Sequence, residues 1–251
     1  MARFSNRTAV VTGAASGMGR ATARRIASEG GRVVSIDIAD RGGADTVALI
    51  DRDGGPPALA IECDVADPVQ VETAIAEALA FAGQIDVLVN CAGTGYYSHF
   101  TEQTPAEVER VMAVNFGGTF WTCRYAMDAL LASRGCVVNI ASAAAVRGCA
   151  YLSAYAASKG AVLAFTKSLA VEYGSRGLRA NAVCPGGTDT PLLGLFTPPA
   201  DADHRLMTRD HNLFGRMLTP EEVAGTITFL ASDDAAMTTG ATVLVDAGST
   251  S

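Results

Sequence analysis

Tyr155 and Lys159 lie four residues apart in the alanine-rich run 153–160, and their spacing points to acid/base chemistry. If this run is helical, both side chains project from one face. A phenol titrates near pH ~10, so a tyrosine base at neutral pH needs a pKa roughly 3 units lower, worth about 4 kcal/mol. A nearby ammonium favours the phenolate. Because one lysine does not supply the whole shift, the pair needs a second cation from elsewhere.

The pattern of apolar segments predicts an α/β protein that forms one domain over residues 1–251. Short apolar runs alternate with helical periodicity, which is typical of a parallel sheet covered on both faces. We interpret the following runs as strands: 8–12, 32–37, 58–63, 85–89, 136–141, 178–184 and 241–246. No repeat or linker interrupts the alternation, so we expect a doubly wound parallel sheet, a Rossmann fold, with about seven strands.

Two segments depart from simple alternation, and two helix starts are marked by their residues. The helical stretch 105–133 contains Asn115, Gly117 and Gly118, and glycines inside a helix each cost up to ~1 kcal/mol, so close packing or a bend is expected there. Helix N-caps are expected at Asp67 and Thr219, each followed by proline. Residues 192–217 are irregular and too long for an ordinary connection, and we interpret them as a substrate lid.

The first predicted strand runs into a glycine-rich turn that opens a helix. Gly13, Gly17 and Gly19 let the backbone approach a pyrophosphate, and the free N–H groups of the helix N-terminus attract its charge. Ser16 and Met18 lie within the same loop. The spacing is GxxxGxG rather than GxGxxG, and its place between a strand and a helix predicts a dinucleotide-binding loop.

Asp37 ends the second predicted strand, 24 residues after Gly13. A carboxylate there can accept hydrogen bonds from both hydroxyls of an adenosine ribose, and it repels a 2′-phosphate. No basic residue precedes Gly17, and Ile38 and Ala39 offer none after Asp37. The sequence therefore favours NAD over NADP, while the alternative for Asp37 is a solvated carboxylate at a strand end.

Ligands of open α/β sheets bind beyond the carboxyl ends of the strands. The residues that we expect at these ends are the Gly13 loop, Asp37, Asp64, Asn90, Ser142 and Pro185-Gly186. A nicotinamide ring in this crevice would be the second cation that Tyr155 needs. Tyr155 would then take the hydroxyl proton of an alcohol while hydride passes to NAD⁺, and Ser142 would position the reacting oxygen.

Taken in order, these motifs resemble the short-chain dehydrogenase/reductase family over essentially the whole chain. They are 12–19 (TGAASGMG), Asp64-Val65, 90–93 (NCAG), Asn115, Ser142, Tyr155-x-x-x-Lys159 and Pro185-Gly186 with Thr190. The resemblance implies a catalytic tetrad of Asn115, Ser142, Tyr155 and Lys159. It also implies that Lys159 binds the nicotinamide ribose and that Asn115 kinks its helix to hold a water in a proton relay.

The resemblance further implies adenine contacts at Asp64 and Val65, ribose and backbone contacts around 90–93, and carboxamide contacts around Thr188 and Thr190. Position 188 is usually branched and apolar in the family, and threonine keeps the branch. The full set of expected cofactor residues is Gly13, Ser16, Gly17, Met18, Gly19, Asp37, Asp64, Val65, Asn90, Ala92, Gly93, Tyr155, Lys159, Pro185, Gly186, Thr188 and Thr190.

Two other segments could contact a substrate. Tyr96, Tyr97, His99 and Phe100 either line a substrate pocket or pack against their own domain. The segment 192–217 carries basic residues that could bind an anionic substrate, namely His204, Arg205, Arg209, His211 and Arg216. Acidic residues in the same segment favour ordinary solvated loop charge instead, and these are Asp201, Asp203 and Asp210.

Bulk properties narrow the partners and the location. A net charge of −7 argues against sequence-independent nucleic-acid binding. The six cysteines form no CxxC pair and are expected as free thiols in a reducing compartment, and no cluster has metal-ligand spacing. No signal-peptide core or run of ~18 apolar residues is found, so we expect a cytoplasmic protein without a membrane segment.

Small residues on the Tyr155 helix allow close packing, either on its own sheet or between subunits; they are Ala154, Ala157, Gly160, Ala161 and Ala164. The family commonly forms tetramers through helix packing, so the resemblance implies a homotetramer.

The leading hypothesis is an NAD-dependent enzyme that interconverts a secondary alcohol and a ketone. The sequence does not choose among simple alcohols, hydroxysteroids, polyols and hydroxyacyl compounds. The alternatives are an NADPH-dependent 3-oxoacyl carrier-protein reductase, which Asp37 disfavours, and a non-catalytic NAD-sensing protein, which usually lacks a tetrad member.

Overall fold

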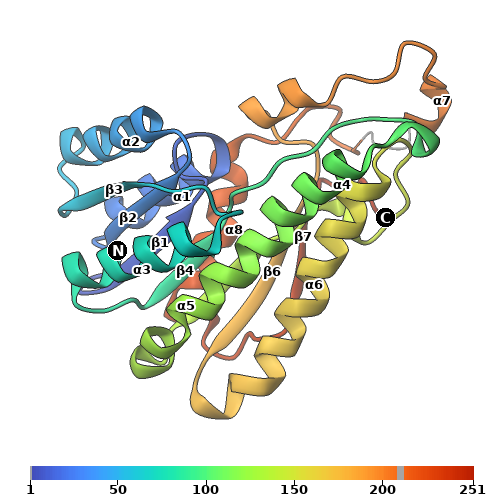
Figure 1. The fold of residues 1–251 in the computed structure, drawn as a ribbon. Helices are drawn as coiled ribbons and strands as arrows, with labels where there is room; N and C mark the ends of the chain where they lie inside the picture. The colour runs from blue at the N-terminus through green and yellow to red at the C-terminus, as the bar shows by residue number, and fades with distance from the viewer. Residues whose placement is uncertain (1, 208–211) are drawn as a thin grey trace.

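The computed structural model describes residues 2–207 and 212–251, and within them the strands form one parallel sheet (Figure 1). The strands are β1 (Thr8–Thr12), β2 (Arg32–Asp37), β3 (Ala58–Glu62), β4 (Val87–Asn90), β5 (Cys136–Ile140), β6 (Arg179–Pro185) and β7 (Thr242–Val245). Their order is β3-β2-β1-β4-β5-β6-β7. The order reverses between β1 and β4, which is where doubly wound sheets bind their ligands. The predicted fold is confirmed.

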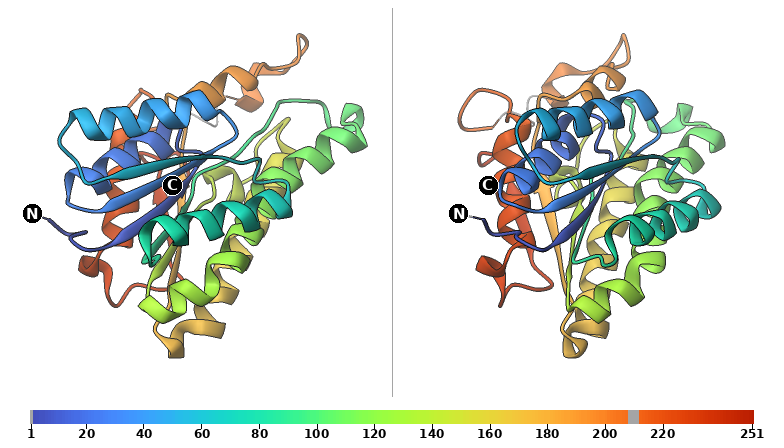
Figure 2. Two further views of the ribbon diagram at one scale, coloured as in Figure 1. Left: turned by 60° about the vertical axis from the view of Figure 1, so that its left-hand side comes forward. Right: turned by 90° about the vertical axis from the view of Figure 1, so that its left-hand side faces the viewer.

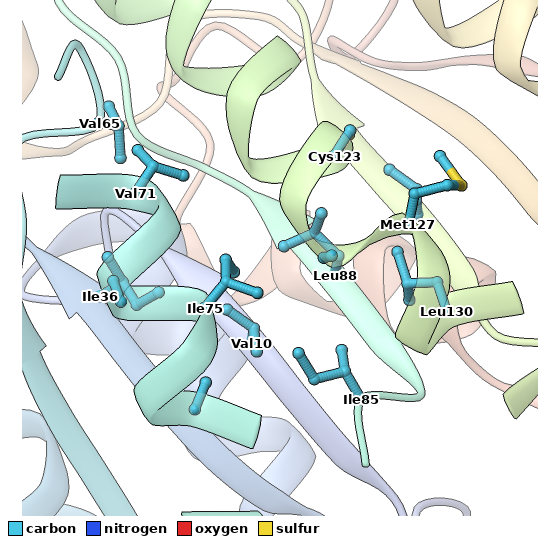
Figure 3. Close-up of a cluster of buried hydrophobic side chains, with 14 of the residues drawn as sticks. Val10, Ile36, Val65, Val71, Ile75, Ile85, Leu88, Cys123, Met127 and Leu130 are labelled. Carbon is cyan, nitrogen blue, oxygen red and sulfur yellow. The ribbon is translucent and has the colours of Figure 1, made fainter. Parts of the chain in front are cut away.

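Helices cover both faces of the sheet (Figure 2). Their bounds are α1 (Gly17–Ser28), α2 (Asp40–Arg52), α3 (Pro68–Ala82), α4 (Pro105–Met112), α5 (Gly118–Ser133), α6 (Ser153–Tyr173), α7 (His204–Met207) and α8 (Pro220–Ala231). Alternate residues of β1 face opposite layers: Val10 packs in the core beneath α3 and α5 (Figure 3), whereas Ala9 and Val11 pack in the core beneath α1 and α8. This double burial explains why the strands read as continuous apolar runs.

The predicted helix starts are present. Asp67 accepts backbone hydrogen bonds from Val69 and Gln70, and Thr219 forms a reciprocal capping box with Glu222. Predicted strand and helix ends agree with the structure to within about two residues, the usual scatter of such boundaries.

The stretch 105–133 is interrupted as expected. A π-helical turn, η2 (Ala113–Gly117), separates α4 from α5 and contains Asn115. Gly118 then passes so close to the loop after β3 that a Cβ atom on it would lie 2.6 Å from Val65 Cγ2. The close packing at this glycine and the π turn before it together place Asn115 beneath the carboxyl ends of the strands.

Two sequence-based expectations need correction. The segment 192–217 is not uniformly irregular, because it contains a 3-10 helix, η5 (Pro191–Leu195), as well as α7; both lie in the orange segment at the top of Figure 1. The predicted strand 85–89 is β4 (Val87–Asn90), so its bounds shift, while Asn90 keeps the strand-end position expected for it. Arg209, Asp210 and His211 lie outside the described residues. Within those residues, no helix combines the length and apolar character needed to cross a membrane.

Candidate active site

Two adjoining cavities lie along the carboxyl ends of the strands. We call the first, of about 380 Å³, the glycine-loop cavity; predicted residues that line it are Gly13, Ser16, Gly17, Met18, Gly19, Asp37, Asp64, Val65, Ala92, Gly93 and Thr190. We call the second, of about 730 Å³, the tyrosine cavity; predicted residues that line it are Met18, Ser142, Tyr155, Pro185, Gly186, Thr188 and Thr190. Met18, Thr190 and Leu192 line both. Most of the predicted cofactor residues therefore line these two neighbouring cavities, but Asn90 and Lys159 line neither.

The glycine loop is built so closely that side chains cannot replace its glycines. A Cβ on Gly19 would overlap the carbonyl oxygen of Gly13, and a Cβ on Gly13 would lie 2.7 Å from the backbone nitrogen of Ala92. Gly13 also adopts a φ of +65°, which disfavours L side chains. The hydroxyl of Ser16 does not cap α1, so no side-chain cap satisfies its first N–H groups. This cradle suits a pyrophosphate.

Asp37 both lines the glycine-loop cavity and holds its wall. Its Oδ2 accepts a hydrogen bond from the backbone N–H of Ala15 at 2.9 Å, and its Oδ1 accepts one from Ala39 at 3.0 Å. Each carboxylate oxygen has a second lone pair. Asp37 can therefore accept hydrogen bonds from ribose hydroxyls while it fixes the loop.

Arg110, which the sequence motifs do not single out, also lines the glycine-loop cavity. Its Nη1 lies 3.0 Å from Asp64 Oδ2, and the other oxygen of Asp64 accepts a hydrogen bond from the backbone of Ala66. Arg110 comes from α4, 46 residues from Asp64 in the chain, and no local pattern links the two. Asp64 is thus ion-paired where the resemblance implies an adenine contact.

Asn90 differs from expectation because its side chain lines neither cavity. Its Nδ2 donates to Asn139 Oδ1 at 2.8 Å, and its Oδ1 accepts from the hydroxyl of Thr122 at 2.8 Å. The side chain thereby ties β4 to β5 and α5 inside the core. A cofactor contact through the backbone of Asn90 stays a prediction.

Ser142, Tyr155 and Lys159 are brought together by β5 and α6. The hydroxyls of Ser142 and Tyr155 are hydrogen-bonded to each other. Lys159 is buried; its Nζ donates to the carbonyl oxygen of Ile140 at 2.9 Å and lies 5.9 Å from the centre of the Tyr155 ring. The expected one-face arrangement of the tyrosine and lysine is therefore present, although the ammonium is hydrogen-bonded to β5.

Burial dominates the electrostatics of this pair. Burial raises the pKa of Tyr155, whereas the hydrogen bond from Ser142 lowers it by a smaller amount. Burial also lowers the pKa of Lys159 to about 8. The phenol is therefore protonated at neutral pH in this state. This agrees with the expectation that the lysine alone does not produce a phenolate.

Asn115 is fully buried and lines neither cavity, but its side chain is hydrogen-bonded to the loop after β4 and to α6. Its Oδ1 accepts from the backbone N–H of Thr94 at 2.8 Å, and its Nδ2 donates to Thr94 O and to Ser158 Oγ, both at 2.9 Å. Ser158 in turn donates to the backbone carbonyl of Tyr155 at 2.7 Å. The asparagine thus ties the loop after β4 to the helix that carries Tyr155, and its implied role in a water relay stays a prediction.

The four aromatic and histidine residues at 96–100 have different roles. Tyr97 lines the tyrosine cavity, while Phe100 is 78% exposed. His99 Nε2 lies 2.9 Å from Asp201 Oδ1, so it anchors the segment 192–217. Tyr96 is partly buried and lines neither cavity.

Two of the arginines in the segment 192–217 form ion pairs with acidic side chains. Arg205 pairs with Asp203 at 2.7 Å, and Arg216 pairs with Glu222 at 2.5 Å. These pairs favour a structural role for the two arginines over anion binding. His204 lines the tyrosine cavity.

The site combines a cradle for a dinucleotide with a phenol and a hydroxyl in an adjoining cavity, and the described residues hold no cluster of metal-ligating side chains. A doubly wound α/β sheet with such a site defines a dinucleotide-binding oxidoreductase.

Comparisons with known proteins agree. A protein-family model described as "Enoyl-(Acyl carrier protein) reductase" matches residues 13–250. The chain is 42% identical to cis-4-hydroxycyclohexanecarboxylate dehydrogenase of Sinomonas cyclohexanicum, over 98% of each chain. It is 38% identical to meso-2,3-butanediol dehydrogenase of Serratia marcescens, over 99% of this chain and 96% of that one. The structure of a short chain dehydrogenase from Mycobacterium paratuberculosis bound to NAD matches with a TM-score of 0.93 and 28% identity over 99% of each chain.

The chain belongs to the short-chain dehydrogenase/reductase family. It is an oxidoreductase that acts on CH–OH groups.

Proposed function

We propose that this protein is an NAD-dependent oxidoreductase that interconverts a secondary alcohol and a ketone, with Tyr155 as the general acid/base. The adjacency of the two cavities, which share Met18, Thr190 and Leu192 in their linings, carries the proposal. It lets one extended dinucleotide reach from the Asp37 wall to the Ser142–Tyr155 pair. The relatives named above act on 2,3-butanediol and on a hydroxycyclohexane carboxylate, as their names state, and both compounds are secondary alcohols.

Bound NAD⁺ supplies the hydride acceptor and a positive charge in the tyrosine cavity. Ser142 holds the reacting oxygen, and Tyr155 takes its proton during oxidation or returns it during reduction. Lys159, with a pKa of about 8, is mainly protonated at neutral pH and favours the phenolate. Asn115 keeps the Thr94 loop and α6 in register by its three side-chain hydrogen bonds.

We favour NAD over NADP because Asp37, at the end of β2, lines the glycine-loop cavity. Its two carboxylate oxygens would repel a 2′-phosphate. Titration of the protein with NADH and NADPH, followed by the fluorescence of Trp121 or of the cofactor, measures the preference. Tighter binding of NADPH would contradict this part of the proposal.

Replacement of Tyr155 by phenylalanine tests the catalytic role. We expect Tyr155→Phe to lower kcat by about 10²- to 10⁴-fold, because the proton transfer is lost, and to leave NADH binding nearly unchanged. Tyr173→Phe, at the other end of α6, is the matched control and should keep full activity. A Tyr155→Phe variant that keeps its turnover would contradict the proposed catalytic role of Tyr155 and would favour a non-catalytic, NAD-sensing role.

The segment 192–217 is proposed as a substrate lid. Its residues Leu193, Phe196 and Met207 line the tyrosine cavity, and its Asp201 is held by His99. These contacts support the proposal.

We further propose a homotetramer in the cytoplasm. Ala157 and Ala164 of α6 are exposed, and a Cβ on Gly160 would meet no atom within 4 Å, so this small-residue face is not used against the chain's own sheet. A second copy of the helix could approach it closely. All six cysteines are free thiols, which suits a reducing compartment. Sedimentation analysis tests the assembly, and a monomer at micromolar concentration would contradict it.

A further inference from the structure

An aromatic wall bounds one side of the tyrosine cavity. The Phe196 ring, which follows η5, meets the ring of Tyr155 edge to face, with 5.4 Å between centroids, and meets Tyr97 with 5.6 Å between centroids. All three residues line the cavity. The catalytic phenol therefore has a side chain of the 192–217 segment directly against its ring.

Gly95 makes this approach possible. A Cβ at this position would lie 2.5 Å from Phe196 Cζ and 2.8 Å from Tyr155 Cδ2. The backbone of Gly95 does not have a positive φ, so glycine is required here by space alone. Because α6 and Ser142 hold Tyr155, Phe196 is the ring that would have to move.

The rest of the cavity is lined by apolar side chains together with a few basic and polar ones. Large apolar side chains come from Leu152, Leu193, Met207 and Met217. The described part of the lining includes no acidic side chain, but it does include Arg147, His204, Asn212 and Arg216, of which Arg216 is paired with Glu222. The ring of Tyr155 contacts the aromatic wall through Phe196. An alcohol with an apolar carbon body suits such walls, whereas a second hydroxyl placed against them would lose its hydration.

The size of the tyrosine cavity also favours a substrate with a large carbon body. A closed cavity of about 150 Å³ is enough to hold benzene. The tyrosine cavity measures about 730 Å³, and under the proposed function it would also receive a nicotinamide ring. Space remains for a ring-containing substrate much larger than a four-carbon diol.

We propose that the substrate is a secondary alcohol on an apolar alicyclic body, and that Phe196, admitted by Gly95, is the specificity-determining residue that packs against this body. This rests on the proposed function and names its substrate class.

The test is a comparison of kcat/KM with NAD⁺ for 2,3-butanediol, 4-methylcyclohexanol and 2-decalol, each as a mixture of stereoisomers. For the wild-type enzyme we expect kcat/KM to rise with each added ring, by about 10-fold or more. Phe196→Ala should lower kcat/KM for the two ring alcohols by about 10-fold or more and change 2,3-butanediol by less than about 3-fold, with NADH affinity unchanged.

Two further variants separate packing from folding. Phe196→Leu should restore much of the lost kcat/KM, because it keeps apolar bulk. Gly95→Ala should lower kcat/KM for all three alcohols, because its Cβ would meet the rings of both Phe196 and Tyr155. Phe214→Ala, which removes a 73% exposed phenylalanine of the same segment, is the matched control and should leave all three substrates unchanged.

A wild-type enzyme that prefers 2,3-butanediol would overturn the inference, and so would equal losses on all three alcohols in Phe196→Ala. Either result leaves the dehydrogenase function intact. Absence of turnover on every alcohol, with NADH bound, would instead contradict the proposed function itself.

Discussion

The two cavities of this protein are built by different means. The glycine-loop cavity is made largely from backbone at strand ends, where Gly13 and Gly19 leave no room for a single Cβ. The tyrosine cavity takes much of its wall from side chains of a long connection, including Phe196 and Met217. A backbone-built site accepts one kind of ligand, whereas a side-chain wall can be changed without moving the sheet. The cofactor end should therefore tolerate substitution poorly and the substrate end well.

The strongest test of this comparison is Gly19→Ala. The added methyl group would overlap the carbonyl oxygen of Gly13, so the loop must open, and we expect the Kd for NADH to rise by about 100-fold or more. Gly225→Ala in α8 is the control, because a Cβ there meets no atom within 4 Å. That variant should keep NADH affinity and gain up to about 1 kcal/mol of stability. Unchanged NADH binding in Gly19→Ala would remove the contrast between the cavities.

The pH dependence of turnover tests the tyrosine cavity. The pKa of Tyr155 is raised by burial, so alcohol oxidation, which needs the phenolate, should accelerate as pH rises, by at most about 10-fold per unit. Ketone reduction, which needs the phenol, should slow over the same range. Initial rates in both directions from pH 6 to 10 measure this. Parallel profiles in the two directions would argue against Tyr155 as the titrating group.

Asp37→Ala sharpens the comparison at the cofactor end. It removes a carboxylate that holds the Ala15 backbone and faces the expected ribose, so the Kd for NADH should rise by about 10- to 100-fold. The Kd for NADPH should change much less, because the repulsion of its phosphate disappears as well. Asp45→Ala, at an exposed position of α2, should change neither value.

The smallest effect is expected at the anchor of the 192–217 segment. Asp201 raises the pKa of His99 and His99 lowers that of Asp201, so the charged pair forms between those two pKa values and is lost as pH rises through the raised pKa of His99. Asp201→Asn should raise KM for the alcohol by about 2-fold at pH 6, as expected for an exposed ion pair, and lower the His99 pKa measured by NMR. Asp203→Asn is the control. A His99 pKa that does not move would contradict the contact.

The cofactor end could be predicted from the sequence to a large extent because its signals are local. Glycine spacing after a strand, a carboxylate at the end of the next strand and the Tyr155–Lys159 spacing each lie within one element or its turn. The substrate end could not, because Phe196 lies in a segment without periodicity and meets Gly95 and Tyr155 only after folding. The pairing of Asp64 with Arg110 was missed for the same reason.

By itself the sequence determined the sheet, its layers and the shared helix face of Tyr155 and Lys159, because apolar periodicity and turn residues act over short distances. Only the tertiary structure decided where the polar groups point: Asn90 into the core, Lys159 onto the carbonyl of Ile140, and Asn115 between Thr94 and Ser158. Each choice depends on a partner brought close by packing of distant segments. A buried polar group takes the partner that folding supplies, since leaving it unpaired costs about 1–3 kcal/mol.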